Sequence, residues 1–71
     1  MKTSREIKYY SAPMGYICTI PKGTPVVPAR NLPDKMRAFW AKRWEGMNEQ
    51  AESYYRNYGF LLYPNELEND N

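Results

Sequence analysis

The first third of the chain has the apolar pattern that is typical of β-strands. The segment "GYICTI", residues 15–20, is rich in β-branched and aromatic side chains, as expected for a half-buried strand. Alternation along this strand would place Tyr16, Cys18 and Ile20 on one face. The segment "REIKYY", residues 5–10, has the same character in a less regular form. The pattern therefore predicts a strand at each place.

A turn is predicted directly after the second of these strands. In "PKGT", residues 21–24, Pro21 suits the second position of a β-turn, and Gly23 can adopt the positive φ that a type II turn requires. The sequence thus predicts a hairpin that pairs the strand before the turn with the apolar stretch after it. Pro25 and Pro28 have no backbone N–H to donate, so the returning strand should be short and lie at a sheet edge.

The segment "KMRAFWAKRW", residues 35–44, fits two structures. As a helix it would begin after Asp34, end at Gly46 and gather its large side chains on one face. That face would consist of Met36, Phe39, Trp40, Trp44 and Met47. As a strand it would separate Phe39 from the two tryptophans. Helix propensity favours the first alternative. We favour a strand over residues 38–44, because clustered aromatic side chains suit a pleated surface and the preceding chain resembles a β-meander.

Residues 48–58 are predicted to form a helix. Asn48 is a good N-cap, acidic side chains follow in the first turn, and Gly59 is a natural stop. Glu52 and Arg56 are spaced as a stabilising i, i+4 pair. The apolar stripe of this helix consists of Met47, Ala51, Tyr54, Tyr55 and Tyr58. This stripe needs a surface to pack on, which the neighbouring aromatic segments can supply.

The last apolar run is "FLLY", residues 60–63, which fits a central strand buried on both faces. Beyond Pro64 the sequence is acidic and polar, which predicts a mobile tail over residues 65–71. Residues 1–64 would then form a single small domain. The predicted fold class is α+β: a small β-rich meander or Src-homology-3-like barrel, with one helix (residues 48–58) before the last strand.

The order of these elements resembles that of a Src-homology-3-like barrel. The resemblance lies in the "KGT" turn, the tryptophan-bearing strand and the final "GFLLYP" strand. The helix is an addition to that pattern, and the acidic peptide-binding segment of such barrels is missing, so binding of proline-rich peptides is not implied. Residues 20–63, with "IPKGTPVVPARNLP" and "WEGMNEQAESYYRNYGFLL", also resemble small uncharacterised open reading frames of phages, prophages and plasmids. That resemblance implies a mobile-element protein and transfers no chemistry.

Composition limits how this fold can be stabilised. The chain has 71 residues, one cysteine and no histidine. An internal disulfide is therefore excluded, and a tetrahedral zinc site has no plausible ligand set. Burial of aromatic side chains, self-association or a partner must supply the stability. Cys18 fits a small buried residue in a reducing compartment. The sequence has no apolar stretch of membrane-spanning length and no signal-peptide pattern, so we expect no membrane association and a cytoplasmic location in a bacterial host cell.

The charges are divided between the two halves of the sequence. Residues 1–43 contain nine basic and two acidic residues, a net charge of +7, whereas residues 44–71 contain one basic and six acidic residues, a net charge of −5. Such asymmetry in one small domain indicates opposed basic and acidic faces, or an acidic tail folded over a basic surface. The alternative is that both sets are ordinary solvated faces.

Catalysis is not expected, because the usual combinations of catalytic groups are missing from the sequence. Without histidine, Cys18 and the serines lack their common base. The four glycines are scattered and match neither a phosphate-binding loop nor a dinucleotide fingerprint. The sequence therefore predicts a protein that is not an enzyme, uses no cofactor and binds no metal.

Two kinds of binding remain. The first is docking on a host protein, because tyrosine, tryptophan and arginine are enriched at the energetic centres of interfaces. Its predicted contact residues are Arg43, Trp44, Tyr54 and Tyr55, with Glu49 and Glu52 as a charged rim. An acidic helix could also imitate nucleic acid in a basic groove, as an inhibitor of a host defence protein would. Self-association is a further use of the same surface.

The second kind of binding is to single-stranded nucleic acid. In such binders, basic side chains contact phosphates while aromatic rings stack on bases. The residues that would do this are Arg37, Lys42, Arg43 and Trp44. The competing interpretation is that the rings of this segment, Phe39 and Trp40 above all, form the core that a domain without disulfides or metals needs.

Overall fold

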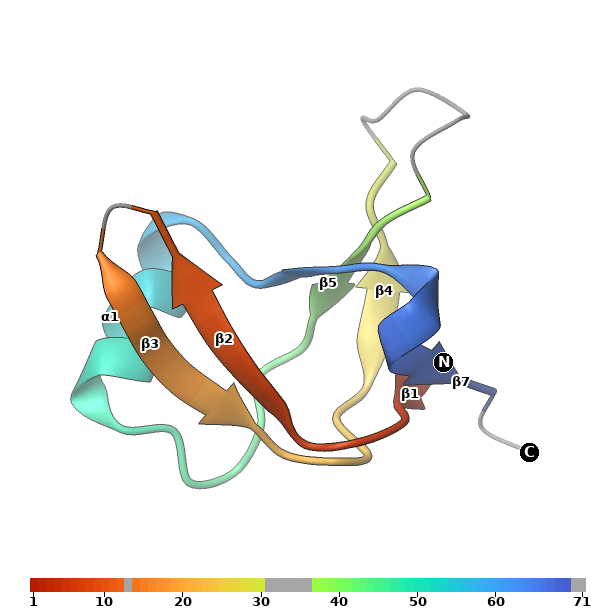
Figure 1. Ribbon diagram of the computed structural model, residues 1–71, viewed down its shortest axis with the longest axis horizontal. Coiled ribbons are helices and arrows are strands. Elements are labelled where there is room, and N and C mark those ends of the chain that lie inside the picture. The colour runs from red at the N-terminus through yellow and green to blue at the C-terminus, as the bar shows by residue number, and fades with distance from the viewer. Residues whose placement is uncertain (13, 31–36, 70–71) are drawn as a thin grey trace.

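The computed structural model describes residues 1–12, 14–30 and 37–69, and shows a strand-rich fold with one α-helix in these ranges (Figure 1). Its strands are β1 (Lys2–Thr3), β2 (Ile7–Ser11), β3 (Gly15–Ile20), β4 (Val26–Pro28), β5 (Phe39–Ala41), β6 (Leu61–Leu62) and β7 (Leu67–Glu68). The helix α1 spans Glu49–Asn57, and a 3₁₀ turn, η1, spans Pro64–Glu66. The predicted α+β class is confirmed. The described strands lie in three separate sheets and not in one closed sheet, so a Src-homology-3-like barrel is not confirmed.

Strands β2 and β3 form an antiparallel hairpin, as their composition predicts. Its register shifts after Tyr9, which pairs with Cys18, because the next pair is Tyr10 with Tyr16. Ile17 is left unpaired between them, which is the arrangement of a β-bulge. The bulge turns Tyr16 outward while Cys18 stays buried. The expectation that Tyr16 shares a buried face with Cys18 is therefore wrong.

The three-stranded sheet has the order β4-β5-β6. The predicted hairpin between residues 15–20 and the stretch after the turn is wrong, because β4 pairs with β5 and β3 pairs with β2. Gly23 does have the expected positive φ, 85°. The edge position expected from Pro25 and Pro28 is confirmed, since β4 has only β5 as a full neighbour in its sheet.

The turn after β3 does not close a hairpin because it is bonded to the start of the chain. The Thr3 hydroxyl donates to the Pro21 carbonyl at 2.8 Å and accepts from the Thr24 backbone N–H at 2.9 Å. The Thr24 hydroxyl donates to the same carbonyl at 2.7 Å. Both threonine side chains are buried and fully hydrogen-bonded, as buried polar groups must be. These bonds hold β1 against the turn and direct the chain toward the second sheet.

The ambiguous aromatic segment contains a strand, but a short one. Only Phe39–Ala41 pair as β5, so the predicted strand over residues 38–44 is confirmed for residues 39–41 only; Lys35 and Met36 lie outside the described residues. Phe39 and Ala41 point into the core, whereas Trp40 is 39% exposed. The interpretation of Trp40 as a core residue is therefore wrong. The predicted central position of the "FLLY" run is also wrong, since β5 is central and β6 lies at the sheet edge.

The C-terminal segment takes part in the fold. Strand β7 pairs with β1, bringing Leu67 opposite Thr3, and the Ser4 backbone N–H donates to the Glu66 carbonyl at 2.9 Å. Leu67 packs against the core. The packed part of the chain thus extends to Glu68, four residues beyond the domain boundary expected at Pro64.

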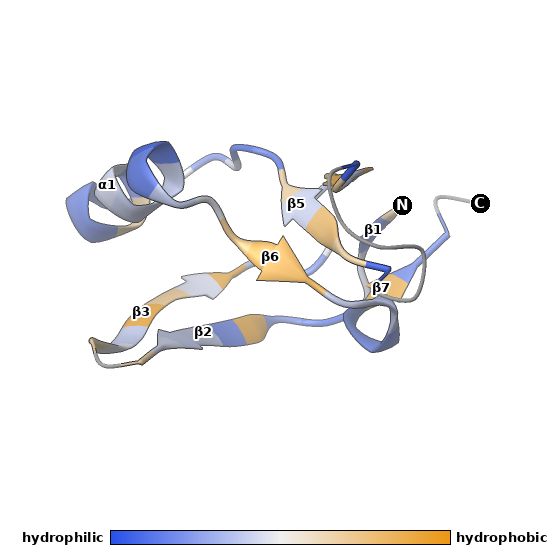
Figure 2. Cartoon of the chain, turned by 90° about the horizontal axis from the view of Figure 1, so that it is seen from above, coloured by the Kyte–Doolittle hydropathy of each residue, from blue (hydrophilic) through white to orange (hydrophobic). Residues whose placement is uncertain are grey.

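The core lies between two offset layers, the hairpin β2-β3 and the sheet β4-β5-β6, with α1 at one end (Figure 2). Phe60 is at its centre and is 0% exposed. Rings from β2, from the β5–α1 connection and from α1 surround it, with centroid distances of 4.9 Å for Tyr9, 5.3 Å for Trp44 and 5.1 Å for Tyr54. A domain this thin therefore obtains its apolar mass from aromatic packing around a single phenylalanine.

Candidate interaction surfaces

The helix that carries most of the predicted contact residues forms as its sequence dictates. The Asn48 side chain accepts a hydrogen bond from the Ala51 backbone N–H at 2.8 Å, so the predicted N-cap is confirmed. Gly59 ends the helix with a φ of 79°, a conformation that favours glycine. Ala51 is the buried residue of α1 and faces β3. This docking fixes which side chains of α1 face the solvent.

The rings predicted to contact a partner lie around the core. Tyr54 stacks on Phe60, Trp44 tilts against it, and Tyr55 has a centroid distance of 6.4 Å from it. All three are half-buried. They belong to the shell that encloses Phe60, so each is only partly exposed to the solvent. The structure brings these rings together, but the contacts that it shows for them are with Phe60 in the core of the fold.

The predicted charged contact residues lie close to one another. Arg43 forms an ion pair with Glu52, although they are nine positions apart in the sequence. A shallow depression on this side of α1 is lined by Arg43, Met47, Glu49, Glu52, Ser53 and Arg56. Its charges are mixed, and an exposed ion pair of this kind contributes little to stability. This surface has neither the single sign of a phosphate-binding site nor the apolar centre of a protein interface.

The residues predicted to bind nucleic acid are not all on one surface. Arg37 and Lys42 are exposed on either side of β5. Arg43 instead pairs with Glu52, and Trp44 packs against Phe60. Two of the four predicted residues are therefore engaged in contacts within the fold.

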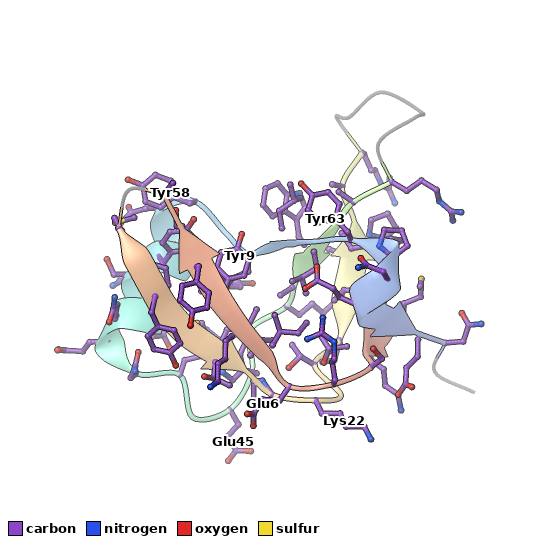
Figure 3. The ribbon with its side chains drawn as sticks, viewed as in Figure 1. Glu6, Tyr9, Lys22, Glu45, Tyr58 and Tyr63 are labelled. Atoms are coloured by element: carbon purple, nitrogen blue, oxygen red, sulfur yellow. The ribbon has the colours of Figure 1, made fainter. Side chains whose placement is uncertain are left out.

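The predicted contact residue Tyr54 lies beside Met14 and Tyr58, which are not among the predicted contact residues. We call the surface formed by Met14, Tyr54 and Tyr58 the tyrosine–methionine patch. Two neighbouring shallow depressions share these three residues. Met14 is 56% exposed and Tyr58 is 64% exposed. The remaining lining residues of the two depressions are Ser11, Ala12, Ile17, Gln50, Ser53 and Asn57, none of which is charged. Figure 3 shows Tyr58 beside the tip of the hairpin.

Local contacts hold the rings of this patch in place. The Tyr54 hydroxyl donates to the Ser11 hydroxyl at 3.2 Å, and the Tyr54 and Tyr58 rings have a centroid distance of 4.9 Å. The helical spacing of these two tyrosines predicts that they are neighbours. The contribution of Met14 could not be predicted, because it depends on how the hairpin packs against α1.

A surface that sequence reasoning missed is the outer side of the sheet β4-β5-β6, which we call the sheet face. It consists of Val27, Trp40, Leu61 and Tyr63. Val27, Trp40 and Leu61 are direct partners in the sheet register and form one row across three strands. Tyr63 follows in extended backbone, two positions after Leu61, so it lies on the same side and is exposed. A Cβ atom on Gly59 would lie 3.1 Å from the Trp40 indole, which shows that this ring rests on the glycine.

Within the part of the chain that the structure describes, the charged residues directly next to β4 and β5 in the sequence are basic. Arg30, Arg37 and Lys42 are exposed at the ends of β4 and β5. The three strands and their flanks, residues 25–30, 37–42 and 59–63, contain no Asp or Glu. In Figure 3 the acidic Glu6 and Glu45 lie at the lower edge of the molecule, far from Tyr63. The sheet face therefore combines exposed rings with three cations at the ends of its strands, and the carboxylate of Glu66 lies at its edge beside Tyr63.

Tyr9 connects the two layers of the fold. Its hydroxyl accepts a hydrogen bond from the Leu61 backbone N–H at 3.2 Å, and its ring meets Phe60 edge-on. Burial raises the pKa of the Tyr9 hydroxyl above its ordinary value of 10.0, and the hydrogen bond from Leu61 opposes this only in part. Figure 3 shows this side chain between β2 and the strand that follows α1.

The raised pKa of Tyr9 predicts a loss of stability in alkaline solution. Because folding raises this pKa, the neutral Tyr9 hydroxyl contributes to the free energy of unfolding. This contribution is fully present below pH 10.0 and is lost as the pH rises through the folded-state pKa. We expect the free energy of unfolding, measured with urea between about pH 8 and pH 11, to fall at the alkaline end. Tyr9→Phe should reduce that fall, whereas Tyr10→Phe, at an exposed ring, should retain it. If the free energy of unfolding falls equally in the Tyr9→Phe protein, the alkaline loss of stability does not come from the Tyr9 hydroxyl.

Cys18 is free and buried, which confirms the expectation that it serves as a small core residue. Burial also raises the pKa of its thiol, which disfavours the reactive thiolate.

No protein-family model matches the chain, and neither a curated protein nor a solved structure resembles it significantly. The resemblances to phage open reading frames and to Src-homology-3-like barrels thus stay predictions. Among the described residues, no helix has the length and apolar character needed to cross a membrane. The function must therefore be argued from the two surfaces themselves.

Proposed function

We propose that the chain is a non-enzymatic binding protein that docks on a host protein through the tyrosine–methionine patch. The observation that supports this most directly is the pair of adjacent depressions that share Met14, Tyr54 and Tyr58 and have no charged residue in their lining. The centres of protein interfaces are depleted in charge and enriched in tyrosine and methionine. The patch has this composition, and Gln50, Ser53 and Asn57 give it a neutral polar rim.

The chemistry of these side chains suits recognition of a protein. Tyrosine offers a large rigid ring at low cost in conformational entropy, and methionine adapts its shape to the partner. Tyr54 is held by its bond to Ser11 and by stacking on Phe60. A ring that is already fixed loses little entropy on binding. Tyr58, which is more exposed, is then the main contact, and Tyr54 supports it.

The charged depression beside Arg43 and Glu52 has a secondary place in this proposal. It lies on α1 next to the patch, and Ser53 lines both. Exposed charges at the rim of an interface mainly affect the association rate and its dependence on salt. Glu49 and Glu52 therefore keep their predicted place as a charged rim, and Arg43, predicted as a contact residue, joins them there. Trp44 and Tyr55 become supports of the fold.

Affinity capture with site variants tests the proposal. The tagged chain should retain a stoichiometric protein from a bacterial lysate, and the double variant Met14→Ala with Tyr58→Ala should weaken binding of the purified partner by at least about 30-fold, as expected for a hot spot. Tyr16→Ala is the matched control, because Tyr16 is exposed on the hairpin but lines neither depression. Equal binding by the double variant, with unchanged circular dichroism, would contradict docking at the patch.

The phage or plasmid origin and an action against a host defence protein extend this proposal. They are supported by the resemblance of residues 20–63 to mobile-element reading frames. The test is expression in a bacterial host with an active defence system, followed by phage challenge. The double variant should restore the defence if inhibition proceeds through the patch, and Tyr16→Ala should not.

A further inference from the structure

The sheet face is a surface that docking at the tyrosine–methionine patch does not use. Val27, Trp40 and Leu61 stand in one row across β4, β5 and β6, and Tyr63 lies beside them. In Figure 3, Tyr63 is well separated from Tyr58 along the long axis of the molecule. From these residues and their charged neighbours we propose that the sheet face binds single-stranded nucleic acid, with Trp40 as the principal stacking platform.

The aromatic side chains have the placement that stacking requires. Trp40 is on the central strand, 39% exposed, with its indole resting on Gly59. One part of the indole contacts the protein, and its exposed part is available to stack on a base. Tyr63, on the neighbouring β6 side, is 44% exposed and supplies a second ring. Stacking on such rings tolerates any base, because every base has a flat aromatic surface.

Charge complementarity decides which partner suits this face. Arg30, Arg37 and Lys42 are exposed at the ends of β4 and β5, and residues 25–30, 37–42 and 59–63 contain no carboxylate. The Glu66 carboxylate lies beside the sheet face and accepts a hydrogen bond from the Tyr63 backbone N–H. Glu68 lies opposite Lys2 in the β1-β7 pair. An apolar protein partner would gain little from three cations, whereas a phosphate backbone would pair with each of them.

The structure changes the residues through which nucleic-acid binding would occur. Arg43 and Trp44 are replaced by Arg30 and Trp40, because the former are engaged with Glu52 and Phe60. Arg37 and Lys42 remain. This inference uses no residue of the tyrosine–methionine patch, so either proposal can fail without affecting the other.

The test uses the full chain and a fluorescein-labelled oligothymidylate of about 12 nucleotides, a length typical for one small single-strand binding domain. We expect anisotropy to show binding at low salt, with a slope of log K against log salt of about −2, since three phosphate contacts contribute about −0.7 each. Trp40→Ala should weaken binding by about 5- to 150-fold. A duplex of the same length should bind less tightly, because its bases are not available for stacking.

Two kinds of variant keep the result clear if Trp40→Ala disturbs the fold. Arg37→Ala and Lys42→Ala change exposed side chains, and each should reduce the salt slope by about 0.7. Arg56→Ala is the matched control, because Arg56 is an exposed cation on α1 and is not part of the sheet face; it should leave the slope unchanged. In a Trp44→Phe protein, Trp40 is the only tryptophan, so quenching of its fluorescence by the oligonucleotide would report stacking directly.

The proposal is overturned if the chain binds no oligonucleotide at low salt. It is also overturned if Arg56→Ala changes the slope as much as Lys42→Ala, since binding would then reflect net charge alone. Concentration-dependent mass that Trp40→Ala abolishes, without oligonucleotide binding, would assign the sheet face to self-association instead. Quenching of Trp40 fluorescence by the oligonucleotide, together with the predicted salt slope, would support nucleic-acid binding at the sheet face.

Discussion

Replacement of Phe60 by alanine is expected to unfold the protein at room temperature. Phe60 is fully buried, and the rings of Tyr9, Trp44, Tyr54 and Tyr55 all contact it. Truncation of a buried phenylalanine costs about 3–5 kcal/mol, which is the lost transfer free energy together with the cavity left behind. A core of this size without disulfides or metals supplies only about 3–5 kcal/mol in total.

The measurement is urea or thermal unfolding followed by circular dichroism. Phe60→Leu is the conservative control: it keeps most of the apolar volume, so the variant should stay folded with a lower midpoint. Tyr63→Ala is the control for loss of a ring at an exposed position. A Phe60→Ala protein with an unfolding midpoint near that of the parent would show that the ring cluster does not dominate the stability.

Local features of the fold could be predicted from the sequence because their causes are local. The helix follows from Asn48 as N-cap, Gly59 as stop and the acidic first turn, and the structure confirms each. The strands β2 and β3 follow from their β-branched and aromatic composition, and the positive φ at Gly23 follows from the turn. Each depends on residues within a few positions of one another.

Pairing between strands could not be predicted in the same way. The turn at Gly23 is compatible with a β3-β4 hairpin, and only the bonds from Thr3 and Thr24, about twenty positions apart, show why the chain goes elsewhere. The bulge at Ile17 shifts the register of the hairpin and so exposes Tyr16, and the alternation of apolar and polar residues in the sequence gives no sign of this shift. Such contacts are long-range, and hydrophobic periodicity carries no information about them.

The candidate surfaces show the same limit. The aromatic and basic content of residues 37–44 predicts a binding segment, but it does not distinguish the tryptophan that packs inward from the one that stays outside. The short strand β5 decides this: Trp40 is on its outer face, and Trp44 follows after the chain has turned back toward Phe60. The sequence therefore identifies the residue types of the surface, whereas the register determines which of them are exposed.

Removal of residues 65–71 is expected to cost about 2–4 kcal/mol, although their composition alone suggests a dispensable tail. The truncation removes β7, and with it the partner of β1. The bond from the Ser4 backbone N–H to the Glu66 carbonyl is lost, and so is the packing of Leu67 on the core. Because β1 also holds the turn at Thr24, loosening of β1 should spread to the connection between the two sheets.

Two further variants separate these contributions. A chain ending at Asn69 retains β7 and every described contact, so its free energy of unfolding should equal that of the parent. Leu67→Ala in the full chain removes only the apolar packing and should cost about 1 kcal/mol, because the side chain is half-buried. Urea unfolding of the chain that ends at Pro64, the chain that ends at Asn69 and the Leu67→Ala variant checks the expected order of their stabilities. If the chain that ends at Pro64 is as stable as the one that ends at Asn69, the β1-β7 pair does not stabilise the fold, and the domain ends where the sequence alone places its boundary.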